Sequence, residues 1–429
     1  KWPTQGPQGF QVANSARFNR GSSDSLTRTL GTPTNNKKWT YSFWVKQSLI
    51  DVDQYLLNTG SDTSYIYFRP SNANPAPFGF SIEQYVGGFQ YRLIPNMVFR
   101  DPSAWRHIVI AFDTTQGTDT NRVKVYDNGT QITSFNTASY PSQNLDTQTN
   151  SALAHKIGGY SSGGYLGGYL SEVCFVDGQQ LAPTSFGEEN SQTGIWVPKS
   201  VTGLTFGTNG FYQNYSNSGA LGEDFSGEDN DFTVNNLTSL DQSTDTCSTN
   251  FATWNPLRTQ AGFSKTMADG NLSFTNSAGD NASIPSTMAA SSGKWYAEFK
   301  CTTNPSNWGF GIAQVNQTIL SGGSMGGYPD SQGGVTYTKN GNLSWYNGGV
   351  AYLKDGRLIW YAGGDQSSST GTTYGTNDVI GILMDLDNTR VYWYKNDVLV
   401  NSGGFNYSVV NNGSTVENNY YFMAGSKDG

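Results

Sequence analysis

The densest group of side chains that could bind a metal lies between Glu223 and Asp231. This segment, EDFSGEDND, places five carboxylates around a Ser-Gly pair. Carboxylate oxygens are ligands that calcium prefers. The candidate calcium ligands are Asp224, Glu228, Asp229 and Asp231. The spacing does not match an EF-hand loop, and a solvated turn rich in Asx residues is the alternative interpretation.

Two loop regions carry aromatic rings of the kind that bind sugars. One lies at residues 158–169, and the other combines residues 341–348 with 360–364. The apolar face of a sugar stacks on an exposed ring, while amides and carboxylates bind its hydroxyls. The candidate ligand-binding residues are Tyr160, Tyr165, Tyr169, Trp345, Tyr346, Trp360 and Tyr361. The alternative is that these rings cover a core or fill a subunit contact.

Residue patterns typical of catalysis are scarce in this chain. A glycosidase needs two carboxylates that face one cleft, and the pair that alternates along a strand-like run is Asp385 with Asp387. A Ser-His-Asp site would have to use one of two histidines, His107 or His155, and both lie in strand-like runs. We expect both histidines to be structural, and we expect a chain without catalytic residues or enzyme activity.

The composition predicts an all-β fold. The chain has 429 residues, of which 51 are Gly and 25 are Tyr, and only 14% are charged. Short strands joined by polar turns have such a composition, and no run of ten or more residues keeps apolar positions at helical spacing. The net charge of -8 argues against nucleic acid as a partner, because binding a phosphate backbone needs clustered Lys and Arg.

Membrane insertion and a disulfide framework are not expected either. No run of about 18 apolar residues occurs. The three cysteines, Cys174, Cys247 and Cys301, are too few and too scattered for a framework, so we expect free thiols. Because the chain begins at Lys1 and not at Met, we expect a fragment or a processed form.

Alternating residues and turn signals divide the chain into four parts. We predict an N-terminal segment at 1–10, a β-sandwich at 11–190, a polar, β-rich connector packed on the sandwiches at 191–250 and a second sandwich at 251–429. Residues 39–46 alternate apolar odd positions with polar even ones, except at Trp44, which lies in a second apolar layer or on a ligand face. Asn128-Gly129 between two alternating runs predicts a two-residue hairpin.

The ordered motifs of the first sandwich resemble a known family. They read WRHIVIAFD at 105–113, VKVYDNG at 123–129, IGG at 157–159 and GYLSEVCFVDG at 168–178. This series is similar to the laminin G-like family, which implies a concanavalin-like, jelly-roll sandwich.

The second sandwich resembles another family with a concanavalin-like fold. SGKWYAEF at 292–299, GFGIA at 309–313 and DVIGILMDLDN at 378–388, followed by YKN at 394–396, are similar to SPRY domains. That resemblance explains Asp385 and Asp387 as turn formers. It also implies a further strand after residues 420–426, so the last strand is either missing from this chain or supplied by another.

A laminin G-like unit followed by an SPRY-like unit resembles virion proteins of marine bacteriophages. This resemblance implies a tail fibre or spike, or a capsid fibre or knob, that contacts other virion proteins and a host-surface glycan or protein, in a homo-oligomer at the virion surface. A secreted bacterial adhesin or extracellular-matrix protein of the same domains is the second interpretation, and a glycoside-acting enzyme is the third.

Overall fold

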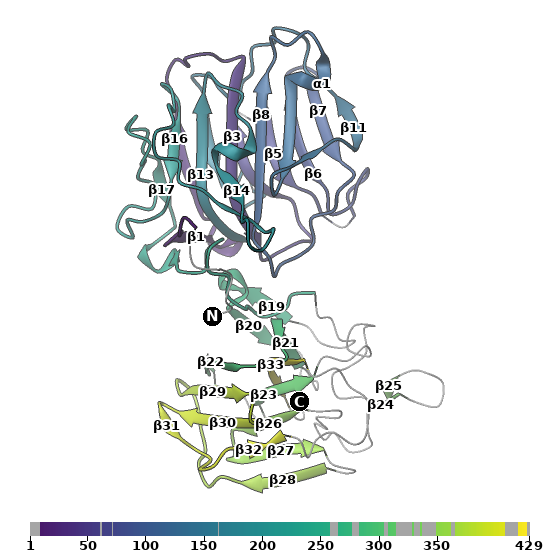
Figure 1. Cartoon of the computed structure of the whole chain (residues 1–429), viewed down its shortest axis with the longest axis vertical. Coiled ribbons are helices and arrows are strands. Elements are labelled where there is room, and N and C mark those ends of the chain that lie inside the picture. The colour runs from purple at the N-terminus through teal and green to yellow at the C-terminus, as the bar shows by residue number, and fades with distance from the viewer. Residues whose placement is uncertain are drawn as a thin grey trace. The chain divides into compact units, whose positions relative to one another are not determined.

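The chain forms two compact units that consist almost entirely of β-strands (Figure 1). The computed structural model describes residues 9–60, 62–70, 72–161, 163–257, 265–276, 283–303, 308–314, 328–329, 335–336, 349–361, 365–407 and 419–426. The first unit comprises residues 1–251 with 268–270, and the second comprises 252–267 with 271–429. The predicted all-β fold is confirmed.

Helical structure in the described ranges is limited to single turns. These are α1 (Asp119–Arg122), η1 (Arg20–Ser22), η2 (Pro183–Ser185), η3 (Ser239–Asp241) and η4 (Asp269–Asn271). None of them is long and apolar enough to cross a membrane.

The first unit is a sandwich of two eight-stranded sheets. Sheet A runs in the order β10 (Thr130–Ile132), β9 (Val123–Asp127), β8 (Arg106–Asp113), β3 (Lys38–Gln47), β13 (Gly168–Asp177), β1 (Ser15–Phe18) and β18 (Gln242–Ser243), with β16 (Phe211–Gln213) also paired to β13. Sheet B runs in the order β11 (Phe135–Ser139), β7 (Phe89–Pro95), β6 (Phe80–Tyr85), β5 (Ser64–Phe68), β4 (Gln54–Thr59), β12 (Ala154–Ile157), β2 (Ser25–Thr29) and β17 (Thr233–Asn235).

The main core fills the space between these sheets. In β3 the odd residues point inward, as the alternation predicted, and Trp39, Tyr41, Phe43 and Val45 are all buried in this core. One cross-strand row of sheet B faces them with Leu26, Ile157, Leu57, Ile66, Ile82 and Leu93. Because paired residues of antiparallel strands project to the same side, this row fixes which face of sheet B is internal.

The predicted hairpin joins β9 to β10. Asp127 pairs with Thr130, so Asn128 and Gly129 form a two-residue turn with φ of 46° and 79°. Asn and Gly tolerate this left-handed backbone best, which explains why the Asn-Gly pair predicted the turn.

A second apolar layer covers the outer face of sheet A. Its first cluster packs Val109, Cys174 and Val176 against Phe186, Val201 and Phe206 from the chain that follows β13. Its second cluster contains Trp44, Trp105 and Tyr169, with Trp196 and Cys247 packed against them. The strand pair β14 (Gly187–Glu189) and β15 (Trp196–Pro198) also belongs to this following chain. Trp44 is therefore in a second layer, which was one of its two predicted positions.

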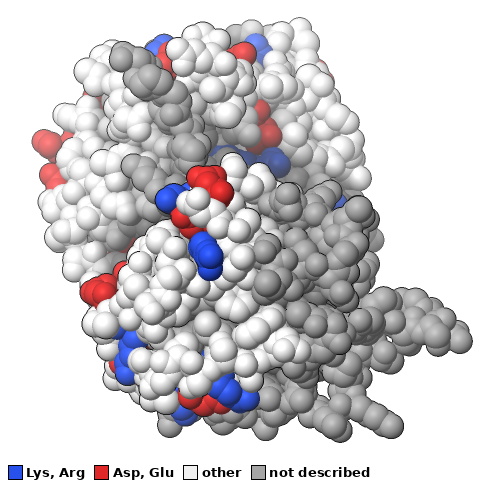
Figure 2. Space-filling view, turned by 60° about the horizontal axis from the view of Figure 1, so that its bottom comes forward, with Lys and Arg blue, Asp and Glu red and all other residues white. Residues whose placement is uncertain are grey.

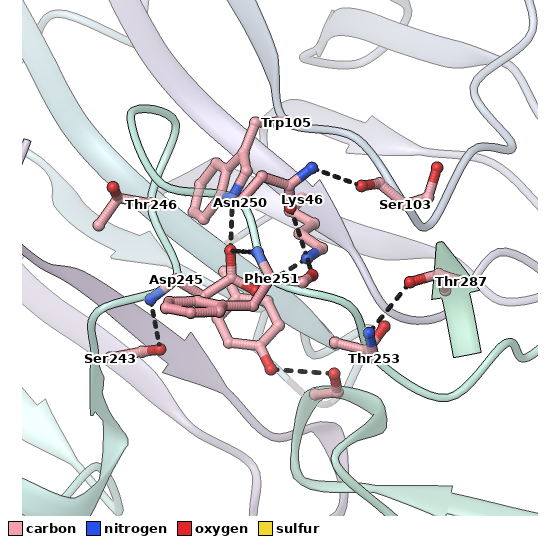
Figure 3. Close-up of polar contacts among 12 residues, drawn as sticks. Lys46, Ser103, Trp105, Ser243, Asp245, Thr246, Asn250, Phe251, Thr253 and Thr287 are labelled. Carbon is pink, nitrogen blue, oxygen red and sulfur yellow. Dashed lines mark hydrogen bonds and ion pairs between the residues drawn. The ribbon is translucent and has the colours of Figure 1, made fainter. Parts of the chain in front are cut away.

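A buried ion pair on the same outer face secures the chain near the end of the first unit (Figure 3). Lys46 Nζ donates to Asp245 Oδ2 and Asn250 Oδ1, both at 2.8 Å, and to the carbonyl of Phe251 at 2.6 Å. Trp105 Nε1 donates to the other oxygen of Asp245 at 2.9 Å. The side chains of Lys46 and Asp245 are only 1% and 6% exposed, so each depends on the other for its charge partner.

The second unit is also built from two sheets. The six-stranded sheet runs β21 (Ser283–Ala290), β33 (Tyr420–Ser426), β23 (Trp308–Gln314), β26 (Val350–Leu353), β27 (Arg357–Tyr361) and β28 (Asp365–Ser369). The five-stranded sheet contains β22 (Lys294–Lys300), β29 (Val379–Asp385), β30 (Arg390–Lys395), β31 (Val398–Leu399) and β32 (Phe405–Asn406). Trp393 is fully buried and donates from Nε1 to the Phe310 carbonyl at 3.0 Å, which joins the two sheets.

Two short strand pairs complete the described structure. They are β19 (Lys265–Ala268) with β20 (Ser273–Asn276), and β24 (Tyr328–Pro329) with β25 (Val335–Thr336). The three cysteines are free thiols, as predicted, and Cys174 and Cys301 are buried as small apolar groups.

Candidate functional site: the outer face of sheet B

The outer face of sheet B presents one continuous row of polar and aromatic side chains. Strand register places them opposite one another from β17 to β7 in the order Thr233, Thr27, Lys156, Asn58, Tyr65, Glu83 and Arg92. The row is one residue out of phase with the internal apolar row, so it projects away from the core. Among the described residues of the first unit, the two outer-layer clusters cover sheet A, whereas this face of sheet B carries polar and aromatic side chains.

A cluster of tyrosines occupies the middle of this face. Tyr55 stacks on its cross-strand partner Tyr67, with ring centroids 4.7 Å apart and planes 10° apart. Tyr160, from the loop after β12, lies 4.6 Å from Tyr55, and Tyr65 meets the edge of Tyr55 at 5.8 Å. Tyr55, Tyr65 and Tyr160 remain partly exposed. Such rings provide an apolar platform with hydroxyl groups at its rim.

A polar groove lies beside the tyrosine cluster. Its volume is about 280 Å³, and it is lined by Thr27, Arg28, Thr29, Asn58, Gly60, Ala154, His155, Lys156, Ser161 and Thr233. Hydroxyl, amide and cationic groups therefore meet beside aromatic rings. This combination suits a polyhydroxylated ligand, since hydrogen-bonding groups fix orientation while rings supply contact area.

Charged groups at the β6–β7 end of the face neutralise one another. Arg92 Nε lies 2.9 Å from Glu83 Oε2. Burial, together with the charge of Glu83 and a hydrogen bond to it, raises the pKa of Tyr67 to about 12, so its hydroxyl stays protonated and can donate. Only 14% of the residues are charged, and most of the described surface in the view of Figure 2 is neither acidic nor basic.

The structure brings together two of the three candidate tyrosines in the first unit. Tyr160 contacts Tyr55, and the ring of Tyr165 lies 5.7 Å from Lys156 Nζ, so both belong to the face of sheet B. Tyr169 does not. It is 1% exposed, packs with Trp44 and Trp105 on sheet A, and donates to the carbonyl of Gly270. The expectation that it lies on an exposed loop is corrected, because β13 already begins at Gly168.

Only some of the candidate residues of the second unit lie within the described residues. Trp345 and Tyr346 lie outside the described residues, as does the side chain of Tyr361. Trp360 lies on β27, is partly buried and packs 4.8 Å from Phe405. Ligand binding by these four residues stays a prediction.

The carboxylates of the candidate calcium segment hold their own loop together. Asp224 Oδ1 accepts from the backbone N–H of Tyr212 at 2.7 Å and Ser226 at 2.9 Å, and its Oδ2 accepts from the Ser226 hydroxyl and the Asn230 N–H. Asp231 accepts from the Asp224 N–H at 2.8 Å. Among the described residues, no group of three or more His, Cys, Asp or Glu side chains is placed to hold a metal. Calcium binding by Asp224, Glu228, Asp229 and Asp231 stays a prediction that calorimetric titration with calcium would check.

His107 is buried and neutral. Its Nδ1 accepts from Trp196 Nε1 at 2.9 Å, and an indole nitrogen is only a donor, so the ring proton is on Nε2. Nε2 then donates to Ser42 Oγ at 2.8 Å. Burial lowers the pKa of His107 to about 3, which keeps this tautomer at neutral pH. The pair is therefore not arranged as a serine nucleophile with its general base, which would need Nε2 to accept.

The other candidate catalytic groups also have structural contacts. Both ring nitrogens of buried His155 lie within 2.8 Å of backbone carbonyls. Asp385 accepts from the backbone and side-chain nitrogens of Asn388, and Asp387 accepts from the Gly293 N–H at 2.7 Å. Asp385 thus holds the turn that begins at Leu386, and both histidines have structural contacts, while the expectation of no enzyme activity stays a prediction.

Sequence reasoning missed Tyr55, Tyr65 and Tyr67. A signal for them was present, because residues 64–68 read SYIYF, with tyrosines alternating against Ile66 and Phe68. That alternation predicts one apolar face and one face of aromatic rings with polar hydroxyls. The contact of Tyr160 with Tyr55 depends on the pairing of β12 with β4, which no local pattern reveals.

The first unit has a concanavalin-like lectin fold, and comparison with known families agrees with this assignment. Residues 20–182 match the laminin G family model described as the concanavalin A-like lectin/glucanases superfamily. The match confirms the laminin G-like resemblance of the first sandwich. The SPRY resemblance of the second sandwich stays a prediction. A search of curated proteins found no match.

Several solved structures are similar to parts of the chain. A putative carbohydrate-binding protein from Bacteroides ovatus is 14% identical with a TM-score of 0.39, and the match covers 55% of this chain and 60% of that protein. Domains LG4-5 of the mouse laminin α1 chain are 9% identical with a TM-score of 0.32, covering 99% and 85%. Tailspike protein 2 of the Escherichia coli O157:H7 bacteriophage CAB120 is 12% identical with a TM-score of 0.28, covering 43% and 28%.

Proposed function

We propose that this chain is a carbohydrate-binding, lectin-like protein that holds a glycan on the outer face of sheet B. The observation that carries the proposal is the partly exposed tyrosine cluster beside a groove lined with hydroxyl, amide and cationic groups. The groups needed to stack on a sugar and to bind its hydroxyls converge there. The second apolar layer on sheet A leaves no equivalent face among the described residues of that sheet.

The location we propose is the surface of a bacteriophage virion, as a tail fibre or spike or a capsid fibre or knob. The tandem resemblances in the sequence support this proposal. The protein would contact other virion proteins and a host-surface glycan or protein, with several copies in a homo-oligomer adding weak sites together. Mass spectrometry of purified phage particles tests this location. Recovery of the chain only from bacterial cell-surface extracts would favour the secreted adhesin or matrix protein instead.

Removing the central ring of the cluster is expected to weaken glycan binding. Tyr55→Ala should raise the Kd for a glycan identified on an array by about ten-fold, because hot-spot aromatics contribute more than about 1 kcal/mol. Tyr55→Phe keeps the ring and should keep most of the affinity. The matched control is Tyr296→Ala, which removes an exposed tyrosine of the second unit. If Tyr296→Ala abolished binding and Tyr55→Ala left it intact, the site would belong to the second unit.

The chain is proposed to bind its glycan without cleaving it. After prolonged incubation with the full chain, a bound oligosaccharide should keep its length in mass spectrometry. Asp385→Ala and Glu298→Ala should both leave binding unchanged, since neither residue lies on the face of sheet B. Release of shorter sugars that stops in the Asp385→Ala or Glu298→Ala protein would instead support a glycoside-acting enzyme.

A further inference from the structure

The groove beside the tyrosine cluster has an uneven charge. Of its ten lining residues, two are cationic, Arg28 and Lys156, and none is a carboxylate. The chain as a whole carries a net charge of -8. In a protein with a net negative charge, the overall composition does not explain why two cations and no carboxylate line one groove. A ligand that pairs with these cations would explain them.

Lys156 lies at the centre of the groove and has no charge partner among the described residues. Strand register places it between Thr27 and Asn58 on the outer face. Its Nζ donates to the carbonyl of Tyr160 at 3.2 Å and lies 5.7 Å from the ring of Tyr165. These contacts orient the ammonium group without neutralising it. Two of its three donors therefore remain available to a ligand.

Arg28 is the second cation without a carboxylate partner in the part of the chain that the structure describes. Its NH1 donates to the backbone carbonyl of Asp231 at 2.6 Å, and its buried Nε has no hydrogen-bond partner. The carboxylate of Asp62 accepts from the N–H and the hydroxyl of Ser161 at the edge of the groove, and its single negative charge is smaller than the two positive charges of Arg28 and Lys156. The groove thus keeps an excess of positive charge.

We infer that this groove binds the negatively charged group of an acidic polysaccharide, a carboxylate or a sulfate ester, on Lys156. This inference rests on the proposed glycan-binding function and names its ligand class. The ammonium group pairs with the anion, and Thr27, Asn58 and Ser161 lie where they can bind hydroxyls of the same sugar. The rings of Tyr55 and Tyr160 hold the adjacent sugar. A neutral glycan would leave the cation without a partner.

Three matched probes test the ligand class in calorimetry with the full chain at low salt. The probes are an oligogalacturonate, its carboxyl-reduced neutral form, and a sulfated derivative of that neutral form. An anionic probe is expected to bind about ten-fold or more tightly than the neutral one, and its advantage should shrink as salt rises. The better of the two anionic probes identifies the source of the charge. Equal binding of all three would overturn the inference while leaving glycan binding intact, and binding of none would overturn both.

Variants that each remove one positive charge show which residue binds the anionic probe. Lys156→Gln should weaken binding of the preferred anionic probe about ten-fold and leave the neutral probe unchanged. Lys124→Gln is the matched control, because Lys124 lies on β9 of sheet A and its loss changes the net charge equally. Arg28→Gln shows whether the second cation adds to the effect. If the Lys156 and Lys124 variants bound the anionic probe alike, the groove would not be the anion site.

Discussion

Lys46→Met is expected to lower the free energy of unfolding of the first unit by about 3–5 kcal/mol, the usual cost of leaving one member of a buried ion pair without its partner. The variant removes the charge that faces Asp245, whose side chain is 6% exposed, and it leaves the acceptors of Asn250 and Phe251 without their donor. Urea unfolding followed by tryptophan fluorescence would measure the change. Because the chain has two compact units, only the transition of the first unit should shift.

A surface ion pair provides the control for this experiment. Lys37 pairs with Asp146, and their side chains are 30% and 61% exposed. Lys37→Met should therefore cost no more than about 1 kcal/mol. The double variant Lys46→Met with Asp245→Leu should recover part of the loss, since no charge is then left buried alone. Equal effects of the Lys46 and Lys37 changes would contradict the view that the buried pair secures residues 245–251.

The fold could be predicted because its signals are local. Trp39, Tyr41, Phe43 and Val45 alternate with polar neighbours, and the inward direction of all four follows from the period of a strand. Asn128-Gly129 marks a hairpin because few other residues accept its backbone. Trp44 breaks the alternation of β3. The sequence could not decide whether it lies in a second apolar layer or on a ligand face, because that depends on Trp196 and Cys247, which pack against it from distant parts of the chain.

The candidate site could be predicted only in part because it depends on pairing between distant segments. Tyr160 was identified from its Gly-rich loop, yet its partner Tyr55 lies on β4, which precedes it by about a hundred residues. Tyr169 has the same Gly-rich surroundings as Tyr160, but its burial depends on Trp105 and on chain that follows β13. Local composition cannot distinguish these two tyrosines. The register of sheet B does so, because it decides which rings share a face.

The segment that covers sheet A also determines which face of the sandwich is left for a ligand. Residues 181–251 contribute Phe186, Val201, Phe206 and Trp196 to the second layer. The same segment supplies β17, whose Thr233 extends the row on sheet B. One polar stretch of sequence therefore closes one face and enlarges the other. This double role links the fold of the first unit to its proposed site.

A buried carboxylate at a bulge in β13 gives the first unit a second measurable property. The register of β13 with β3 shifts between Ser171 and Cys174, and Glu172 within the shift has a φ of 49°. Its carboxylate lies on the outer face of sheet A, beneath the second layer, where Tyr212 donates to Oε2 at 2.5 Å. Burial raises the pKa of Glu172 to about 7 from its ordinary value of 4.5, and the hydrogen bond from Tyr212 offsets only part of that rise.

The contribution of Glu172 to the stability of the first unit should therefore fall as the pH rises from about 4.5 to about 7, while buried His107, with its pKa lowered to about 3, contributes in the opposite direction below about pH 6.5. In this window the folded state holds a proton on Glu172 that the unfolded state has already released, so through this one group each increase in pH favours unfolding, and comparison with a Glu172 variant isolates its effect. Glu172→Gln stays neutral and can still accept from Tyr212. Relative to wild type, it should gain up to about 3 kcal/mol in unfolding free energy between pH 5 and pH 8. Glu188→Gln, which changes an exposed carboxylate, should follow the wild-type pH curve. If the Glu172→Gln curve also ran parallel to wild type across this window, the carboxylate would be ionised in the folded protein at every pH tested.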